Sequence, residues 1–183
     1  MPIHPWFARI TFMALVTLLA VVGVAGPDRA AANLNLKFGV HAPPAPIENL
    51  DALRTLEESI GHEADILSIY QGWGNGGWAA VQPEWLERAS GGGARDVLIT
   101  WEPWVAGGAF SQPDYHLTTI TNGRHDAYIA AWARDLKAHG ETIHLRPMHE
   151  MNGHWYPWAG GIPGNTPARY IAAWRRMHGI FQR

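Results

Sequence analysis

Apolar positions along this chain fall into two alternating patterns, short continuous runs and longer stretches with helical spacing. The short runs are rich in branched side chains, as buried strands are, and they cover residues 36–40, 66–70, 97–101 and 142–145. Helical spacing follows each run, over residues 50–60, 83–89, 128–136 and 166–181. Strands that are each followed by a helix predict a parallel sheet with right-handed connections, so we predict an α/β fold.

Residues that typically begin or end helices stand at the borders of this pattern. Gly61 and Gly140 follow the first and third helical stretches, where a left-handed residue usually ends a helix. Thr166 is a suitable N-cap for the last helix, and Pro167 suits its first turn. The borders therefore support four strand–helix units.

The pentapeptide YIAAW occurs in both the third and the fourth helical stretch. We interpret this as repetition of one strand–helix unit, because both helices would pack against the same kind of sheet. We therefore expect Trp132 and Trp174 to lie in the core. In the fourth helix, Tyr170, Ile171 and Trp174 are predicted to form the buried face.

The N-terminal segment has the features of a secretory signal. Arg9 precedes an apolar run over 10–25, and Ala30–Ala32 supplies the small residues that a signal peptidase accepts. An uncleaved membrane anchor is the alternative, although the run is short of the roughly 20 residues of a membrane span. We expect 1–32 to be the signal, 33–183 to be the folded domain, and the protein to be secreted or extracytoplasmic.

Composition gives no support for some classes of partner and excludes sites that need cysteine. The net charge of −2 gives no electrostatic reason to expect nucleic acid or an anionic membrane as a partner. The chain has no cysteine, which excludes disulfides and thiolate metal sites. We predict no cofactor and no stable membrane association after signal cleavage.

Polar and aromatic residues gather directly after the last predicted strand, in the segment 142–158, TIHLRPMHEMNGHWYPW. Pro147 is expected to end the strand ladder where these residues begin. If the chain stays extended beyond it, Arg146, Met148 and Glu150 point the same way. A carboxylate among large aromatics suits a sugar, because hydroxyls bind polar groups and the C–H face covers an indole ring.

The motif LRPMHEMNGHWYPW resembles the acid/base segment of glycoside hydrolase family 26, and ITWEPW and YIAAWRRMHGIF resemble other parts of the same domain. The best-known members of that family are endo-β-1,4-mannanases with a (β/α)8 TIM barrel. The resemblance implies that Glu150 is the general acid/base, that Arg146 and His149 are polar active-site residues, and that Trp155 is a sugar platform.

The same resemblance implies that the barrel is incomplete here. A full barrel of this type has roughly 250 residues, and the 183 residues of this chain hold about four βα units. The family places its nucleophilic glutamate after the seventh strand, which this chain does not reach. We therefore expect a fragment or truncated product with exposed sheet edges, prone to poor solubility or dimerisation, and a monomer at full length.

Active sites of parallel barrels lie at the C-terminal ends of the strands. Of the residues at these ends, we predict that His41, Trp101, Glu102 and Trp104 bind substrate, together with Arg146, His149 and Trp155. Glu102 is a less favoured alternative for the missing nucleophile, since hydrogen bonding to substrate or to Arg146 suits it better.

Two simpler interpretations apply to the motif residues. Glu150 could be an ordinary carboxylate paired with Arg146. Strand alternation would send His149 to the face opposite Glu150, between strand and helix, unless the chain bends near Pro147. A zinc site is disfavoured, because His149 and His154 are five residues apart rather than the four that a helical zinc motif requires.

The resulting functional hypothesis is a retaining, endo-acting glycoside hydrolase for β-1,4-mannan, of which this chain alone is expected to be poorly active or inactive. Related family members act on β-1,3-xylan or mixed-linkage β-glucan, and these substrates stay open as alternatives. A non-catalytic carbohydrate-binding protein is the alternative from another class. Such modules are usually all-β, so the alternation of strands and helices argues against it.

Overall fold

The computed structural model describes residues 36–41, 49–74 and 80–183. The predicted signal at 1–32 and most of the glycine-rich loop after the second strand lie outside the described residues. The compact unit Leu36–Arg183 contains the following elements. In chain order they are β1 (Gly39–Val40), α1 (Asp51–Ile60), β2 (Ile66–Gly72), α2 (Pro83–Ser90), β3 (Asp96–Glu102), the 3-10 helix η2 (Pro113–Tyr115), α3 (Leu117–Thr121), α4 (Asp126–His139), β4 (Ile143–Pro147) and α5 (Pro167–Phe181).

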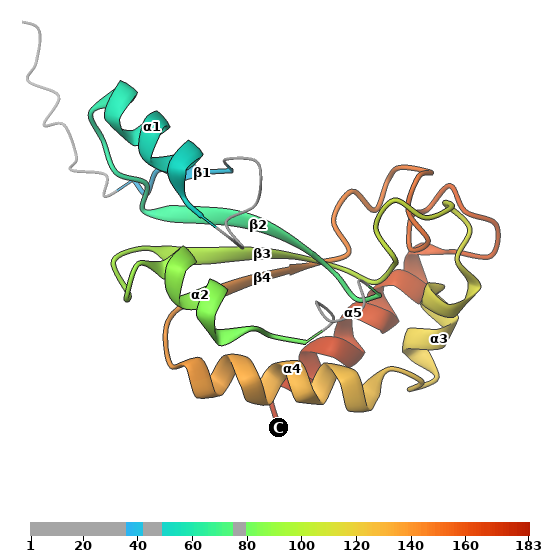
Figure 1. Cartoon of the computed structure of the whole chain (residues 1–183). Helices are drawn as coiled ribbons and strands as arrows, with labels where there is room; N and C mark the ends of the chain where they lie inside the picture. Colours follow the sequence, from blue (N-terminus) through green and yellow to red (C-terminus); the bar gives the residue numbers. More distant parts are fainter. Residues whose placement is uncertain (1–35, 42–48, 75–79) are drawn as a thin grey trace, which may run out of the picture. The chain divides into compact units, whose positions relative to one another are not determined.

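The strands form one parallel sheet in the order β1-β2-β3-β4 (Figure 1). Gly72 at the end of β2 lies opposite Glu102 at the end of β3, and Trp101 lies opposite Pro147 at the end of β4. The C-terminal ends of the three longer strands are therefore level with one another. The α/β prediction is confirmed for a four-stranded parallel sheet.

Alternate strand residues separate into a core side and a polar side. The buried residues of β2 and β3 form one hydrophobic cluster with side chains of the helices, namely Leu67, Ile69, Val97, Ile99 and Trp101 with Trp85, Leu86, Ile129, Trp132, Ala173 and Met177. Each such aliphatic side chain contributes about 1.5–3 kcal/mol when it is fully buried. The alternate positions carry Tyr70, Thr100 and Arg146, which point to the other face of the sheet.

The buried face of α5 differs from the prediction. Trp132 of α4 is buried as expected, but Trp174 of α5 is 41% exposed and Ile171 is about half exposed. The residues of α5 that are buried are instead Ala173, Met177 and Ile180. The prediction of a core Trp174 is wrong because α5 packs mainly against α3 and α4, and Trp174 instead lines a hollow beside β4. The indole of Trp174 stacks on His178 of the same helix, 5.6 Å between ring centroids.

Two short helices between β3 and α4 have no clear periodicity in the sequence. They are η2 and α3, and α3 buries Leu117 and Ile120. Arg176 of α5 connects this region to the rest of the unit, because its guanidinium donates to the Thr121 carbonyl and to the carboxylate of Asp126. The predicted helix ends are confirmed at Gly61 and Gly140, which adopt left-handed conformations.

Pro147 stands inside β4 at a position where it removes no hydrogen bond to β3. The Met148 N–H donates to the Trp101 carbonyl at 3.1 Å, so the even-numbered residues of β4 direct their backbone groups toward β3. Ile143, Leu145 and Pro147 direct theirs to the outer edge, where a missing N–H breaks no bond of the described sheet. None of the helices within the described ranges is long and apolar enough to cross a membrane.

Candidate active site

The segment after β4 turns sharply instead of staying extended. Met148 and Glu150 both have left-handed backbone conformations, with φ of 52° and 51°. The Met148 side chain is consequently buried, whereas Arg146 and Glu150 are exposed. The expectation that these three side chains share one face is therefore wrong. A left-handed conformation costs about 1–3 kcal/mol for a non-glycine residue, so other contacts must hold these two in place.

Four successive carbonyl oxygens of this segment each accept a hydrogen bond. The acceptor–donor pairs are Met148 with the Tyr170 hydroxyl (2.6 Å), His149 with the Trp158 indole N–H (2.7 Å), Glu150 with the Gly153 N–H (3.0 Å) and Met151 with the Gly160 N–H (2.7 Å). Each net hydrogen bond contributes about 0.5–1.5 kcal/mol, so together they offset the backbone strain. The segment is thus a fixed support for Glu150.

Glu150 meets Trp155 rather than Arg146. The Trp155 indole N–H donates to Oε2 of Glu150 at 2.8 Å, and the Trp155 side chain is 39% exposed. The Arg146 guanidinium instead donates from Nε and Nη2 to the Thr100 hydroxyl, at 3.1 and 2.6 Å. Among the described residues, no carboxylate lies within ion-pair distance of Arg146. An ordinary Glu150–Arg146 ion pair therefore does not explain this carboxylate.

Glu102 and His149 form a buried polar pair beneath the exposed side chains of Arg146 and Glu150. Glu102 is 4% exposed, and its Oε1 lies 3.9 Å from Nε2 of His149. Burial raises the pKa of Glu102 to about 6, with Trp104 and Arg146 opposing the shift and Glu150 adding to it. Burial likewise lowers the pKa of His149, against the opposing charge of Glu150. Since 3.9 Å is long for a hydrogen bond and burial disfavours the charged form of each group, we interpret the pair as a packing contact rather than a salt bridge.

His149 lies on the same side as the other site residues because the chain bends after Pro147. Its Nε2 is 3.1 Å from the Tyr156 hydroxyl, and burial raises the pKa of Tyr156 to about 12. The interpretation of His149 as a residue hidden between strand and helix fails for this reason. Its Nδ1 atom is buried and has no hydrogen-bond partner among the described residues.

Aromatic contacts connect the strand ends to one another. The rings of His41 and Tyr70 are 5.3 Å apart, and those of Tyr70 and His149 are 5.5 Å apart, both edge to face. The Arg146 guanidinium lies 6.0 Å from the centre of the Tyr70 ring. Trp104 contacts Tyr156 at 4.9 Å between ring centroids, so the loops after β3 and β4 meet beyond the C-terminal ends of the strands (Figure 1).

Trp101 does not belong to this surface. Its ring is fully buried and packs against Trp132 and Phe181 in the core. The expected contact between Trp101 and substrate is therefore unavailable, because its position in β3 has the same parity as Val97 and Ile99, which face the helices. Glu102, the next residue, has the opposite parity and belongs to the site.

Three tyrosine and threonine side chains have supporting roles that the motif alone did not reveal. Tyr156 holds His149, Tyr170 holds the Met148 carbonyl, and Thr100 holds Arg146. Thr100 lies directly opposite Arg146 in the sheet register, so strand alternation was the signal that could have identified it. Tyr170 is 22 residues from Met148 in sequence, and no local pattern connects them.

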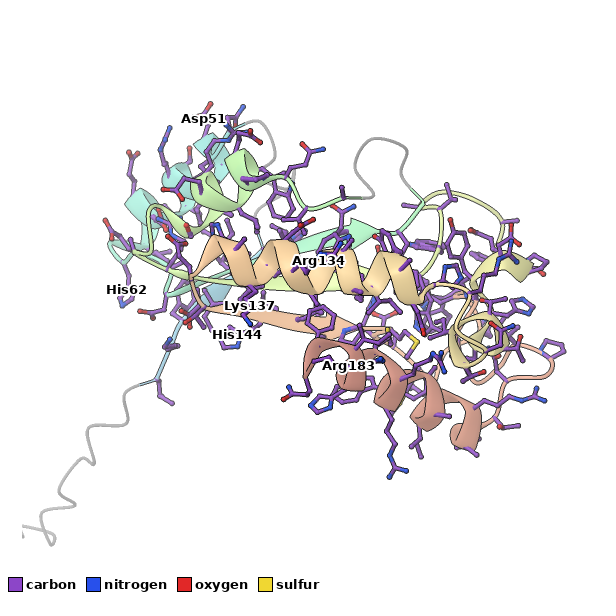
Figure 2. All side chains as sticks on the ribbon, turned by 90° about the horizontal axis from the view of Figure 1, so that it is seen from below. Asp51, His62, Arg134, Lys137, His144 and Arg183 are labelled. Atoms are coloured by element: carbon purple, nitrogen blue, oxygen red, sulfur yellow. The ribbon has the colours of Figure 1, made fainter. Side chains whose placement is uncertain are left out.

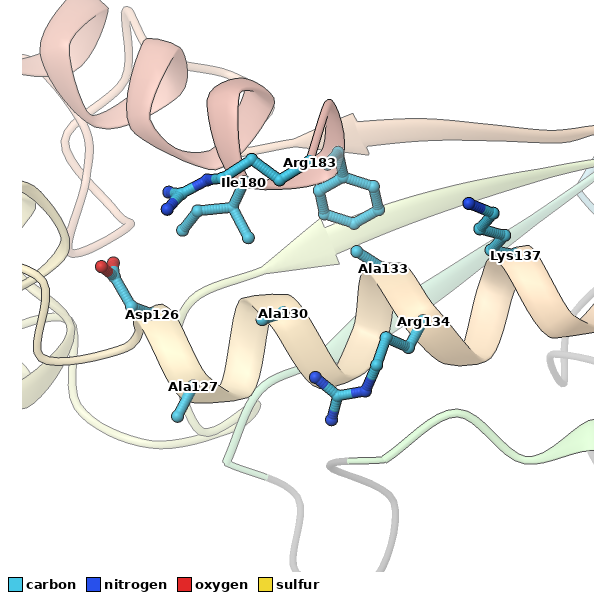
Figure 3. A pocket seen from close by; sticks show the side chains of 9 residues that line it. Asp126, Ala127, Ala130, Ala133, Arg134, Lys137, Ile180 and Arg183 are labelled. Carbon is cyan, nitrogen blue, oxygen red and sulfur yellow. The ribbon is translucent and has the colours of Figure 1, made fainter.

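An open hollow of about 510 Å³ lies beside β4 and is lined by Tyr70, Arg146, His149, Glu150 and Trp174, among others. Another, of about 570 Å³, lies between α4 and α5 and is lined by Ala130, Arg134, Lys137 and Ile180, among others (Figure 3). The second hollow contains none of the predicted site residues. In Figure 2, His62 and His144 also lie away from the loops that form the site.

No group of three His, Asp or Glu side chains in the described ranges is arranged to hold a metal ion. His149, Glu150 and His154 in particular do not converge, because Glu150 is bound by Trp155 and the ring of His154 contacts Trp155 edge to face at 5.0 Å. The side chains gathered at this site carry carboxyl, imidazole, guanidinium, phenol and indole groups.

The model of glycosyl hydrolase family 26 matches residues 47–182. The chain belongs to glycosyl hydrolase family 26. Over 152 residues it is 38% identical to Endoglucanase H of Acetivibrio thermocellus, covering 82% of this chain and 15% of that protein. Over 51 residues it is 43% identical to "Mannan endo-1,4-beta-mannosidase A and B" of Caldalkalibacillus mannanilyticus, covering 26% of this chain and 10% of that protein. This family 26 chain thus spans a small part of the length of each relative.

Proposed function

We propose that this chain carries the general acid/base part of a retaining glycoside hydrolase site that acts on a β-linked polysaccharide. The observation that supports it best is the placement of Glu150, an exposed carboxylate on a fixed support at the end of a parallel strand, bound by an exposed indole. Such a carboxyl group can first protonate the glycosidic oxygen and later activate water.

A retaining reaction also requires a nucleophilic carboxylate about 5–5.5 Å from the acid/base. Glu150 is the one carboxylate among the described residues that line the hollow beside β4. Glu102 suits the role of nucleophile poorly, because it is almost fully buried and burial disfavours the charged form that a nucleophile requires. We infer that the nucleophile comes from another strand of a (β/α)8 barrel, of which the four βα units described here form a part.

Residues around Glu150 have separate roles in this proposal. The exposed ring of Trp155 offers an apolar face to a sugar, and Arg146, held by Thr100 without a carboxylate partner among the described residues, is available to sugar hydroxyls. His41 and Trp104 flank the same surface, and Glu102 with His149 supports it from below.

For the substrate we propose β-1,4-mannan, since one relative is named a mannan endo-1,4-β-mannosidase. The other relative is named an endoglucanase, so mixed-linkage β-glucan is the second substrate to test, followed by β-1,3-xylan. A panel of the three polysaccharides in affinity electrophoresis, beside a reducing-sugar assay, separates binding from cleavage. We expect mannan to retard the chain, with little or no sugar released.

Glu150→Gln is the decisive variant in these assays. Hydrolysis by the chain that disappears in Glu150→Gln would show that a second carboxylate of the chain, with Glu102 as the first candidate, already completes the site. Absence of binding to all three polysaccharides would contradict the proposal. Binding without cleavage in the wild type also fits a second candidate function, a non-catalytic carbohydrate-binding protein, and cleavage that is lost in Glu150→Gln is the result that excludes it.

We also propose that the protein is exported by its N-terminal segment. Expression in a secreting bacterial host, followed by intact mass measurement of the extracytoplasmic fraction, tests this. The mature chain is expected to begin close to residue 33, and a full-length product that stays in the membrane fraction would instead identify an anchor.

A further inference from the structure

Gly153 is connected to Glu150 in two ways, directly by a hydrogen bond and indirectly through the ring of Trp155. Its N–H donates to the Glu150 carbonyl at 3.0 Å, which closes the turn that holds Glu150 in its left-handed conformation. Its α-carbon also lies against the ring of Trp155, whose N–H binds the Glu150 carboxylate. Gly153 is buried, so neither contact is exchanged for water.

The close approach of Trp155 explains why a glycine stands here. Gly153 does not have a positive φ, so its backbone conformation is open to other residues. A Cβ at this position would instead lie 2.8 Å from Cε2 and Cζ2 of Trp155 and 3.1 Å from Cδ2. These distances are shorter than van der Waals contact. The indole is a rigid fused ring system, so its atoms cannot shift individually to make room. Any side chain at Gly153 must therefore displace Trp155.

Gly153 cannot easily move back to make room. Its carbonyl accepts the Gly161 N–H at 3.0 Å, and a Cβ on Gly161 would lie 2.9 Å from that same carbonyl. The backbone of Gly153 is thus enclosed by Trp155 on one side and by Gly161 on the other. An added methyl group at Gly153 is therefore expected to displace the Trp155 ring, which is 39% exposed.

We propose that Gly153 is a positioning residue for Glu150 that acts through Trp155. With the ring seated on Gly153, the indole N–H occupies Oε2 of Glu150 and leaves Oε1 for proton transfer. When Oε1 gives its proton to the glycosidic oxygen, negative charge develops on the carboxylate, and the indole N–H stabilises it at Oε2. The role in proton transfer rests on the proposed function of Glu150. The contacts among Gly153, Trp155 and Glu150 do not depend on that function.

The first test follows the indole N–H of Trp155 by two-dimensional NMR of the ¹⁵N-labelled full chain, with Trp155→Phe to assign its resonance. In the wild type, this resonance is expected to move with pH as its carboxylate acceptor gains a proton, and Glu150→Gln removes that movement. In Gly153→Ala the movement is lost as well. An indole resonance that ignores pH in the wild type, or titrates unchanged in Gly153→Ala, overturns the proposal.

Gly179→Ala in α5 is the matched control, because a Cβ there meets nothing within 4 Å. It is expected to leave the Trp155 resonance and its pH dependence as in the wild type. A cycle with Trp155→Ala supplies a second test by thermal unfolding. Once the ring is absent, Gly153→Ala has no clash to relieve, so its effect on the midpoint is expected to be at least halved. Equal effects of Gly153→Ala in both backgrounds overturn the proposal.

Binding of mannohexaose is the readout that separates this inference from the proposed function. Gly153→Ala is expected to weaken binding about tenfold relative to Gly179→Ala, because the displaced ring no longer presents its face. If no variant binds mannohexaose or a β-glucan oligosaccharide while the pH response of the indole behaves as expected, the positioning role stands and the proposed function fails.

Discussion

The two carboxyl groups at the ends of β3 and β4 have opposite surroundings although they belong to one site. Glu102 is buried beside His149 and Tyr156, where burial disfavours its charge. Glu150 is exposed and accepts a hydrogen bond from Trp155. Below its pKa of about 6, Glu102 is neutral and adds no like charge beside Glu150, which must become an anion during the reaction.

Glu102→Gln is predicted to increase stability in a pH-dependent way. The pKa of Glu102 rises from 4.5 to about 6 on folding, so the folded state binds the proton more tightly than the unfolded state. The stability that protonated Glu102 contributes to the fold is fully present below pH 4.5 and is lost as pH rises through 6. At pH 7 the ionised Glu102 destabilises the fold by up to about 2 kcal/mol, and Glu102→Gln removes this destabilisation. Urea unfolding of both proteins at pH 4 and pH 7 measures the difference.

The sign of this effect distinguishes it from a general packing change. The gain of Glu102→Gln over the wild type is expected at pH 7 and absent at pH 4, where the wild-type carboxyl is already neutral. An equal difference at both pH values would contradict the burial of an ionisable Glu102. Asp96, whose pKa is lowered by the hydrogen bonds from Lys37 and His144, provides the contrast. Asp96→Asn is expected to lose stability at pH 7 rather than gain it.

At the scale of elements, α5 fixes the position of the catalytic segment. Thr166 caps this helix by accepting the Arg169 N–H at 3.2 Å, and Tyr170 in its first turn reaches the Met148 carbonyl at 2.6 Å. The strained residue that follows β4 is thus held by a helix that begins 19 residues later in the chain. The position of Glu150 therefore depends on the hydrogen bond from α5 to the Met148 carbonyl, in addition to its own turn.

Tyr170→Phe tests this dependence because it removes one hydroxyl and leaves the ring. The Met148 carbonyl loses its hydrogen bond, which is expected to lower the free energy of unfolding by about 1 kcal/mol. Hydrogen exchange at residues 148–153 is expected to accelerate about fivefold, while exchange in β2 and β3 serves as the internal control and stays unchanged. Equal acceleration throughout the sheet would mean that Tyr170 supports the whole unit rather than this segment.

The strands and long helices could be predicted from the sequence because each has a clear period or border residue. Runs of branched residues located the sheet, and Gly61 and Gly140 located helix ends that the structure confirms. The helix α3 was missed because it is too short to express a period. Trp132 and Trp174 stand in the same pentapeptide, yet only the first is buried. What covers each helix is a tertiary property, and the local pattern does not contain it.

Part of the candidate site could be predicted from the motif, but its geometry and the burial of Trp101 could not. The motif identified Glu150, Arg146, His149 and Trp155, and the structure brings all four to the end of β4. The contacts of these side chains depend on the left-handed conformation of Met148, which is unexpected for a non-glycine residue. This turn buries Met148, which strand alternation had placed on the same face as Arg146 and Glu150.

At the scale of the whole described unit, one edge of the sheet carries unsatisfied groups and exposed apolar surface together. The outer edge of β4 pairs with no other described strand, and Leu145 there lines a hollow with Trp174, Met177 and Phe181. Trp174 is 41% exposed along this edge, and Ile171 lies one helical turn before it. An open strand edge beside exposed apolar side chains is the usual route to association between chains.

Trp174→Lys is therefore predicted to reduce self-association of the 183-residue chain. The substitution removes a large apolar side chain beside the open edge and adds a charge that opposes pairing with a second chain. Phe110→Lys is the matched control, since Phe110 is 59% exposed in the loop after β3. Size-exclusion chromatography with light scattering, over a tenfold range of concentration, is expected to show dimers or larger species for the wild type and for Phe110→Lys, and mainly monomer for Trp174→Lys.

A wild type that stays monomeric and melts cooperatively at every concentration would mean that this edge is protected by some other means. An equal reduction by both variants would mean that general apolar exposure, rather than the edge of β4, drives association.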